Sequence, residues 1–336
     1  MAHPIPFPLA SGRYEVGPAM RRFGQAGHGM PAETDHFLPD DRLAETLAAK
    51  LAVLQQAARE AHLTADTADE ADLRATLLEC FRLLAAEQPD MAAVDDDGVT
   101  LPHLGLRVRW DGAVTRTGEG RPDLRTVSGS IQDWLCTRDG LSRLGDALGL
   151  AVQEDLAIVR GPGAPGESDV LEWLHVCLPT NWAPSTKIGG SFAAVHEPVV
   201  HSERLTATQG QIIRAMIHAG PFVRNVWGIH RDPALCHNPR LHQEAPWKTD
   251  ALPEAIAAQA FFRVERQTTH GFPSLNRALF TIRYWVAPLA EVAADPWQRE
   301  RLTTALAAMT DEELRYKGLG PARDALVAWL QSGRSL

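Results

Sequence analysis

The stretch that decides the fold is Phe261-Phe-Arg-Val-Glu-Arg-Gln-Thr268, followed after a short gap by Ala278-Leu-Phe-Thr-Ile-Arg-Tyr-Trp-Val286. Both runs are rich in aromatic and β-branched residues and are bounded by turn residues, which predicts two β-strands. Three similar segments lie upstream, at Asp155–Arg160, Leu171–Leu178 and Phe222–Ile229. The sequence therefore predicts a mainly antiparallel sheet of about five strands.

Helical patterns lie mainly outside this group of strands. Leucines recur at helical spacing over Asp41–His62 and again over Asp69–Glu87, which predicts an N-terminal helical hairpin. Further helices are expected at Asp133–Leu150, Gln209–His218, Pro296–Met309 and Pro321–Gln331. Because helices and strands do not alternate regularly, the predicted fold class is α+β, with helices flanking the sheet.

Three regions follow from this pattern. Residues 1–35 are rich in Gly and Pro and are expected to form an extended N-terminal arm. Residues 36–130 would hold the helical hairpin and a connecting segment packed on the core. Residues 131–336 would form the core itself, with the C-terminal helices.

Composition narrows the classes of partner. The 336 residues contain 33 Lys and Arg against 42 Asp and Glu, a formal charge of −9, so no basic excess is available for nucleic acid. The apolar stretches fall short of the roughly 18 residues that a membrane helix needs. The opening Met1-Ala-His-Pro-Ile-Pro-Phe-Pro has no export-signal pattern, so we expect a cytoplasmic protein with neither nucleic acid nor membrane as partner.

Several common motifs are absent or unconvincing. The four cysteines lie dozens of residues apart, which excludes a CxxC zinc site and a compact iron–sulfur cluster. Gly161-Pro-Gly-Ala-Pro-Gly166 has the spacing of a dinucleotide-binding loop, but its prolines remove backbone amides, so it is read as a hairpin loop. His230, His237 and His242 could hold a metal, although the prolines around them favour solvated loop residues.

Two segments have the character of a ligand site. The stretch from His175 to Val199 mixes a buried-type strand, a Pro–Trp turn, a Gly pair and polar residues, as the wall of a ligand pocket requires. In the decisive strand, alternation places Glu265 and Gln267 on one face and Arg266 on the other. An arginine inside a sheet either holds an anion or forms a core ion pair, for which Asp155 is a candidate partner.

Seven short motifs occur in the order found in one known family. They are Cys177-Leu-Pro-x-x-Trp182, Lys187-Ile-Gly, Val195-His-x-Pro-Val199, Arg224-x-x-Trp227, Glu265-Arg-Gln-Thr268, Phe280-Thr-Ile-Arg283 and Tyr316-Lys-Gly318. In this respect the chain resembles the haem-dependent oxidative N-demethylases, of the α-subunit type, over roughly residues 131–330. The resemblance implies a PAS-like sheet that encloses a non-covalent haem b, activates O2 and removes a methyl group from a small methylated amine.

The resemblance also suggests which residues hold the haem. His196 is the preferred axial ligand to the iron, because it follows an apolar run and precedes a proline; His201, His175 and Cys177 are the alternatives.

Other polar residues have expected roles at the same site. The cations Lys187, Arg224 and Arg266 would pair with the haem propionates. Glu265 and His270 would orient the substrate or transfer protons, which makes them the candidate catalytic residues.

Monooxygenation needs two electrons, yet the sequence carries no flavin, nicotinamide or iron–sulfur fingerprint. A separate reductase with flavin and iron–sulfur groups, as the family has, is therefore the expected electron donor. Two other hypotheses stay open: a non-catalytic sensor that binds haem or a gas in a PAS-like pocket, and a relative that binds no haem.

Overall fold

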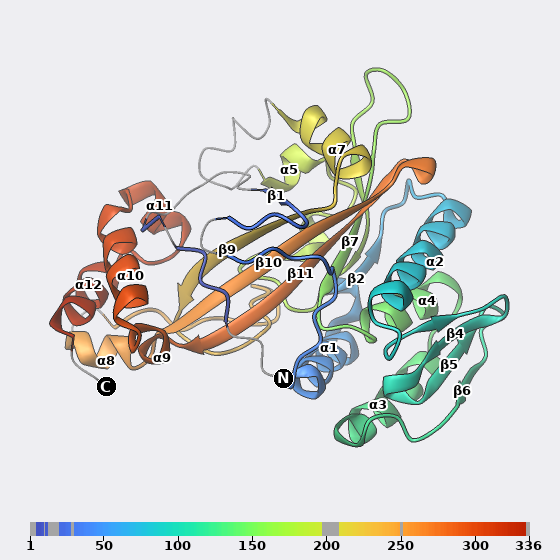
Figure 1. Ribbon diagram of the computed structural model, residues 1–336, viewed down its shortest axis with the longest axis horizontal. Coiled ribbons are helices and arrows are strands. Elements are labelled where there is room, and N and C mark those ends of the chain that lie inside the picture. Colours follow the sequence, from blue (N-terminus) through green and yellow to red (C-terminus); the bar gives the residue numbers. More distant parts are fainter. Residues whose placement is uncertain are drawn as a thin grey trace.

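A computed structural model describes residues 5–9, 11–12, 20–27, 30–196, 208–248 and 251–333. Its centre is one long, twisted antiparallel sheet (Figure 1). The C-terminal helices gather at one end of this sheet, and a second, smaller sheet lies beyond the other end. The α+β class and the mainly antiparallel central sheet are confirmed.

The elements have the following bounds. The strands are β1 (Arg21–Arg22), β2 (His62–Thr64), β3 (Ala93–Val94), β4 (Gly98–Leu101), β5 (Leu106–Arg109), β6 (Val114–Arg116), β7 (Asp155–Arg160), β8 (Val170–His175), β9 (Phe222–His230), β10 (Phe261–Phe272) and β11 (Arg277–Pro288). The helices are α1 (Leu43–Ala57), α2 (Glu70–Glu87), α3 (Arg125–Cys136), α4 (Gly140–Gly149), α5 (Phe192–His196), α7 (Gln209–His218), α8 (Pro253–Ala257), α9 (Leu289–Ala293), α10 (Pro296–Ala308), α11 (Asp311–Tyr316) and α12 (Arg323–Ser332).

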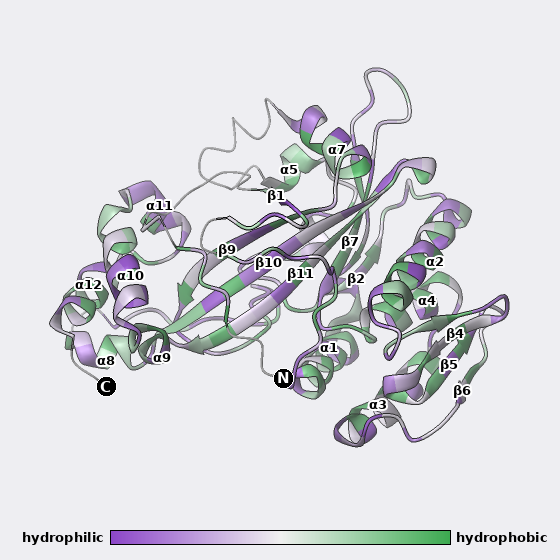
Figure 2. Cartoon of the chain, viewed as in Figure 1, coloured by the Kyte–Doolittle hydropathy of each residue, from purple (hydrophilic) through white to green (hydrophobic). Residues whose placement is uncertain are grey.

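Among the described residues, seven strands form the main sheet, in the order β1-β9-β10-β11-β7-β8-β2. The five strands predicted from the sequence are β7 to β11, and the short β1 and β2 extend the sheet at its two edges. The loop that contains Gly161 joins the antiparallel neighbours β7 and β8, so its reading as a hairpin loop is confirmed. Polar residues interrupt the apolar pattern of β9, β10 and β11 (Figure 2).

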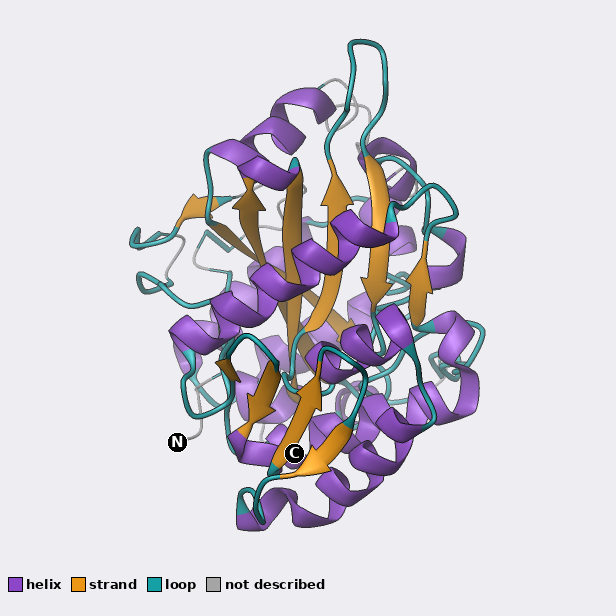
Figure 3. Ribbon diagram, turned by 90° about the vertical axis from the view of Figure 1, so that its right-hand side faces the viewer, coloured by secondary structure: helices purple, strands orange, loops and turns teal. Residues whose placement is uncertain are grey.

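Different helices cover the two faces of the main sheet. On the first face, which we call the pocket face, Ile213 and Met216 of α7 pack against Leu174 and Ala278. The opposite face, here the back face, packs against α1 to α4 at the β7–β8 side, and its Phe262 packs against the C-terminal helices. Seen from the side, helices lie across the sheet and the small sheet is separate from it (Figure 3).

The N-terminal part differs from the predicted helical hairpin. Both helices exist, and Asp69 caps α2 by accepting a hydrogen bond from the Asp72 amide. However, His62 starts the strand β2 between them, and α2 packs mainly on α4 while α1 packs on α3. The connecting segment also contains a second antiparallel sheet, with the strand order β3-β4-β5-β6.

The predicted helix over residues 133–150 is broken into α3 and α4. The break falls just before Gly140, which has a left-handed backbone with φ of 42°. The other expected helices are present as α7, α10 and α12. Within the described ranges, no helix has the length and apolar character needed to cross a membrane.

Candidate functional site

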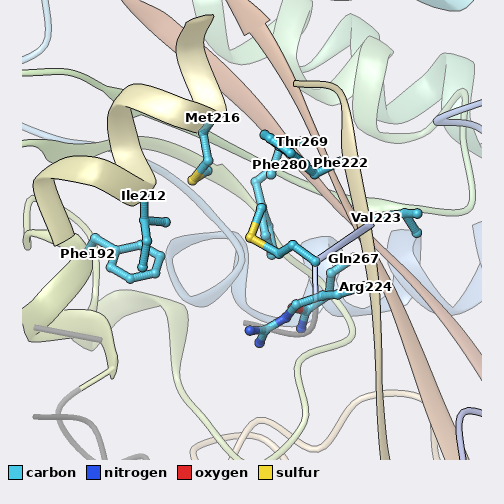
Figure 4. Close-up of a pocket in the computed structure, with 10 residues that line it drawn as sticks. Phe192, Ile212, Met216, Phe222, Val223, Arg224, Gln267, Thr269 and Phe280 are labelled. Carbon is cyan, nitrogen blue, oxygen red and sulfur yellow. The ribbon is translucent and has the colours of Figure 1, made fainter. Parts of the chain in front are cut away.

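A pocket lies between α5 and α7 on one side and the pocket face of β9, β10 and β11 on the other (Figure 4). Its walls are mostly apolar, and ten residues line it: Met20, Phe192, Ile212, Met216, Phe222, Val223, Arg224, Gln267, Thr269 and Phe280. The space within it, its opening included, is about 430 Å³. Small-molecule and cofactor sites commonly have such mostly apolar walls with a few polar groups among them.

The polar end of this pocket is a chain of hydrogen bonds along the pocket face. Arg224 donates from Nε to Oε1 of Gln267 at 2.7 Å, and Gln267 donates from Nε2 to Oε2 of Glu265 at 2.8 Å. Strand pairing places Arg224 directly opposite Gln267, so both side chains leave the sheet on the same side. Figure 4 shows these two side chains together, apart from Met216 on α7.

A second cation joins this cluster from the turn after α11. Lys317 donates from Nζ to the backbone oxygen of Trp227 at 3.0 Å. Burial, together with the nearby charge of Arg224, lowers the pKa of Lys317 to about 8, although the carboxylate of Glu265 opposes this shift. Two cations near one carboxylate leave this end of the site with a net positive charge, which suits an anionic group. Lys317 lies in the family motif Tyr316-Lys-Gly318, but no sequence pattern assigned it a role at the site.

Two predicted haem-binding residues lie near α5. His196 is the last residue of α5 and comes one helical turn after Phe192, which lines the pocket. Lys187 lies beside the same helix, with Nζ 3.5 Å from the backbone oxygen of Ala194. The side chain of His196, and the whole of His201, lie outside the described residues.

Arg266 points away from the pocket, to the back face. Its Nε donates to the Glu33 carboxylate, and its NH groups donate to the backbone oxygens of Asp35 and His36. A core ion pair does form, but its partner is Glu33. The suggested partner Asp155 instead accepts hydrogen bonds from two backbone amides and lies 3.9 Å from Lys50 Nζ.

His270 shares the back face with Arg266. Its ring makes an edge contact with His36, with 4.8 Å between the ring centroids. Burial, helped by the nearby His36, lowers the pKa of His270 to about 4. The structure thus separates this candidate catalytic residue from Glu265, which faces the other way on the same strand.

The alternative axial ligands His175 and Cys177 lie in tightly packed core. His175 Nε2 is 3.3 Å from Oδ1 of Asp146, and a Cβ placed on Gly149 would come within 2.2 Å of the His175 ring. Burial raises the pKa of the Cys177 thiol well above its ordinary value, which opposes the thiolate form needed for iron binding.

The interpretation of His230 and His237 as solvated loop residues is wrong. Their side chains are only 6% and 1% exposed. The loop folds back on the end of β9, because Arg263 donates hydrogen bonds to the backbone oxygens of Ala234 and Leu235 and holds the loop there.

Together, the fold and the pocket define a class: an α+β protein with a mostly apolar pocket on one face of an antiparallel sheet and a cation, Arg224, in the pocket lining. The sequence matches the family of haem-dependent oxidative N-demethylases, alpha subunit-like, over residues 32–327. The chain therefore belongs to that family. The match includes all the strands from β2 to β11 and the helices that cover them.

The pocket residues fit the haem that this family name implies. A haem needs apolar walls for its ring and cations for its propionates; Phe192, Met216 and Phe280 are apolar residues of the lining, and Arg224 is a cation in it. His196 lies at the end of the short helix that bears Phe192, four residues after it.

Proposed function

We propose that this chain is the haem-binding subunit of a monooxygenase that removes a methyl group from a small methylated amine. The observation that carries this proposal is the mostly apolar pocket on β9–β11, with the hydrogen-bonded pair Arg224 and Gln267 in its lining, in a chain of the N-demethylase family. When bound, haem b supplies an iron that activates O2 for oxidation of the N-methyl group.

The chain's own residues would divide the work between the two ends of the pocket. His196 would hold the iron from α5, and Arg224, with Lys187 near the opening, would bind the propionates. Glu265, which accepts a hydrogen bond from Gln267 of the pocket lining, would orient the substrate or transfer protons. Gln267 fixes the positions of Arg224 and Glu265 by bonding to both.

Electrons would come from a separate reductase subunit with flavin and iron–sulfur groups. The alpha subunit-like name of the family implies that other subunits exist. We also propose that residues 131–336 form a PAS-like haem domain, with residues 36–130 packed on it and residues 1–35 as an arm. The spatial order of the five long strands is β8-β7-β11-β10-β9, so that β11, the last of them in the chain, lies beside β7, the first in the chain. This order supports the PAS-like assignment.

The test is a visible absorption spectrum of the haem-loaded protein, compared among wild type, His196→Ala and the control His218→Ala. His218 is an exposed residue of α7, so its loss should leave the haem unchanged. We expect an intense Soret band in wild type and in the control, and a lost or shifted band in His196→Ala. With an external electron donor, the wild type should consume oxygen only when a methylated amine is present.

Other outcomes would decide between the remaining hypotheses. A Soret band that His196→Ala leaves unchanged would place the axial ligand elsewhere. Stable binding of oxygen or carbon monoxide, without oxidation of any amine, would indicate a sensor. No Soret band at saturating haem would contradict the oxygenase proposal.

A further inference from the structure

A second cluster of titratable residues lies at the end of β9 that is remote from the pocket. His230 is the last residue of β9, and the segment after it returns so that His237 and Glu244 lie beside it. The two histidine rings meet edge to face, with centroids 4.7 Å apart. Glu244 is 25% exposed, whereas the two histidine side chains are buried, so the cluster meets solvent at Glu244.

The ligand atoms of these three residues are spaced as a metal ion requires. All lie within 4.8 Å of one another; Oε2 of Glu244 is 3.6 Å from Nδ1 of His230 and 3.9 Å from Nδ1 of His237. A tetrahedral ion about 2.0–2.1 Å from each ligand places neighbouring ligand atoms about 3.4 Å apart. The two distances to Glu244, 3.6 and 3.9 Å, are therefore within about 0.5 Å of the ideal value, and the two histidine nitrogens, at most 4.8 Å apart, need to approach by no more than about 1.4 Å.

The groups behind these ligands are arranged as in known metal sites. Ligating residues usually bond their second polar atom to another protein group, which fixes their orientation. The Arg231 amide donates to Oε1 of Glu244, which leaves Oε2 facing the histidines. Oδ1 of Asp232 lies 3.2 Å from Nε2 of His237, although it is not aligned for a hydrogen bond, and Oδ2 lies 2.9 Å from Nε2 of His242.

His237 is the member that most needs a ligand. Neither ring nitrogen makes a hydrogen bond within the described part of the chain, although the side chain is almost fully buried. Buried polar atoms nearly always have a partner, so two unpartnered atoms on one ring call for an explanation.

The backbone holds His237 in place without any ion. Its amide donates to the Pro179 oxygen at 2.9 Å, and its oxygen accepts from the Asn181 amide at 3.1 Å. Arg263 also joins the loop to the oxygen of Leu178 at 2.8 Å. The ligand group is therefore built into the fold on two sides, which is the preorganisation that tight metal binding needs.

Another histidine cluster, formed by His62, Asp146 and His175, differs in the hydrogen bonding of its ring nitrogens. His62 bonds to Asp146 through Nδ1 at 2.6 Å and accepts from Trp173 Nε1 through Nε2 at 2.9 Å. Both nitrogens of His62 are occupied, so this cluster is a hydrogen-bond network. It serves as an internal control for the first cluster.

We propose that His230, His237 and Glu244 bind one divalent transition-metal ion of the zinc class, with solvent in the fourth position. Imidazole and carboxylate ligands in a tetrahedral arrangement favour zinc among the common divalent metals. Asp232 orients His237 from behind. The ion closes the loop onto the end of β9, and its binding does not depend on haem.

The test measures the zinc that the full-length chain binds. Elemental mass spectrometry counts zinc and iron separately, so that haem iron is not mistaken for the proposed ion. Protein is exposed to excess zinc, passed through a desalting column and titrated against a chromophoric chelator. We expect one tightly held zinc in wild type, and affinity at least about 100-fold weaker in His237→Gln and Glu244→Gln. Asp232→Asn should weaken binding by about 10- to 100-fold, as outer-shell changes do.

Two controls locate the ion. His218→Gln removes an exposed histidine, and His62→Gln disrupts the other cluster; both should keep full zinc binding. No tightly held zinc in wild type would overturn the proposal, and so would zinc retained by Glu244→Gln or lost from His62→Gln. Near-UV circular dichroism verifies folding, and Glu244→Gln, which preserves side-chain size, decides the matter if His237→Gln does not fold.

Discussion

Two arginines on the main sheet, Arg224 and Arg266, have opposite environments. Arg224 lines the wall of the pocket and bonds to Gln267, the immediate chain neighbour of Arg266. Arg266 is 1% exposed and is bonded to Glu33 and to two backbone oxygens on the back face. Because side chains alternate along β10, Gln267 faces the pocket with its cross-strand partner Arg224, whereas Arg266 faces the back of the sheet.

A second buried arginine on the back face also pairs with a carboxylate from the N-terminal segment. Arg283 on β11 donates to Asp40 at 2.6 Å, and both side chains are 3% exposed. The N-terminal segment thus supplies carboxylates to two buried arginines, whereas Arg224 and Gln267 on the pocket face line the pocket. We infer that changes on the back face affect stability and that changes on the pocket face affect the ligand.

The largest effect is expected from Arg266→Met. Removing one member of a buried ion pair leaves the other carboxylate without its partner, which typically costs about 3–5 kcal/mol. Chemical denaturation should show a loss of this size in the free energy of unfolding. The Soret band of the haem-loaded variant should keep its position; a shifted band with unchanged stability would place Arg266 at the haem instead.

Arg224→Met should have the reverse profile. A hydrogen bond to a charged group contributes about 1.5–3 kcal/mol, so haem affinity should fall by about 10- to 100-fold. Stability without haem should change much less than in Arg266→Met, and Arg224→Lys should restore part of the affinity. Haem titration followed at the Soret band measures this; equal affinity in both proteins would mean that no propionate reaches Arg224.

The smallest effect is a pH dependence that arises on the back face. The pKa of His270 is about 4 in the folded protein, because the ring is buried, and about 6.5 when unfolded. Between these values the unfolded chain binds the extra proton, so His270 reduces stability as pH falls from about 6.5 to 4. His270→Gln should show a shallower decline over this range in melting experiments, whereas the exposed-site variant His218→Gln should follow the wild type.

The sequence predicted the elements with a clear period and missed the short ones. The β10 and β11 segments alternate over many residues and were assigned correctly. β3 has two residues and β6 has three, too few for a period to appear. The alternation also placed Glu265 and Gln267 together on one face, and these are two of the polar residues around the pocket.

Contacts between residues that are far apart in the chain could not be predicted from the sequence. Nothing near Arg266 identifies Glu33, and nothing near His237 indicates that Arg263 will bury its loop. Lys317 is polar and follows a short helix, so only the completed fold shows that it approaches Glu265. These features depend on tertiary contacts, which local patterns do not encode.

The ion pair between Glu33 and Arg266 also determines when this part of the protein can fold during translation. The two residues are 233 positions apart, and Asp40 and Arg283 are separated by 243. At about 5–20 residues per second, the ribosome adds the arginines roughly 10–50 s after their carboxylates. During that interval the early segment cannot reach its final place, so the back face of the sheet is completed only late in translation.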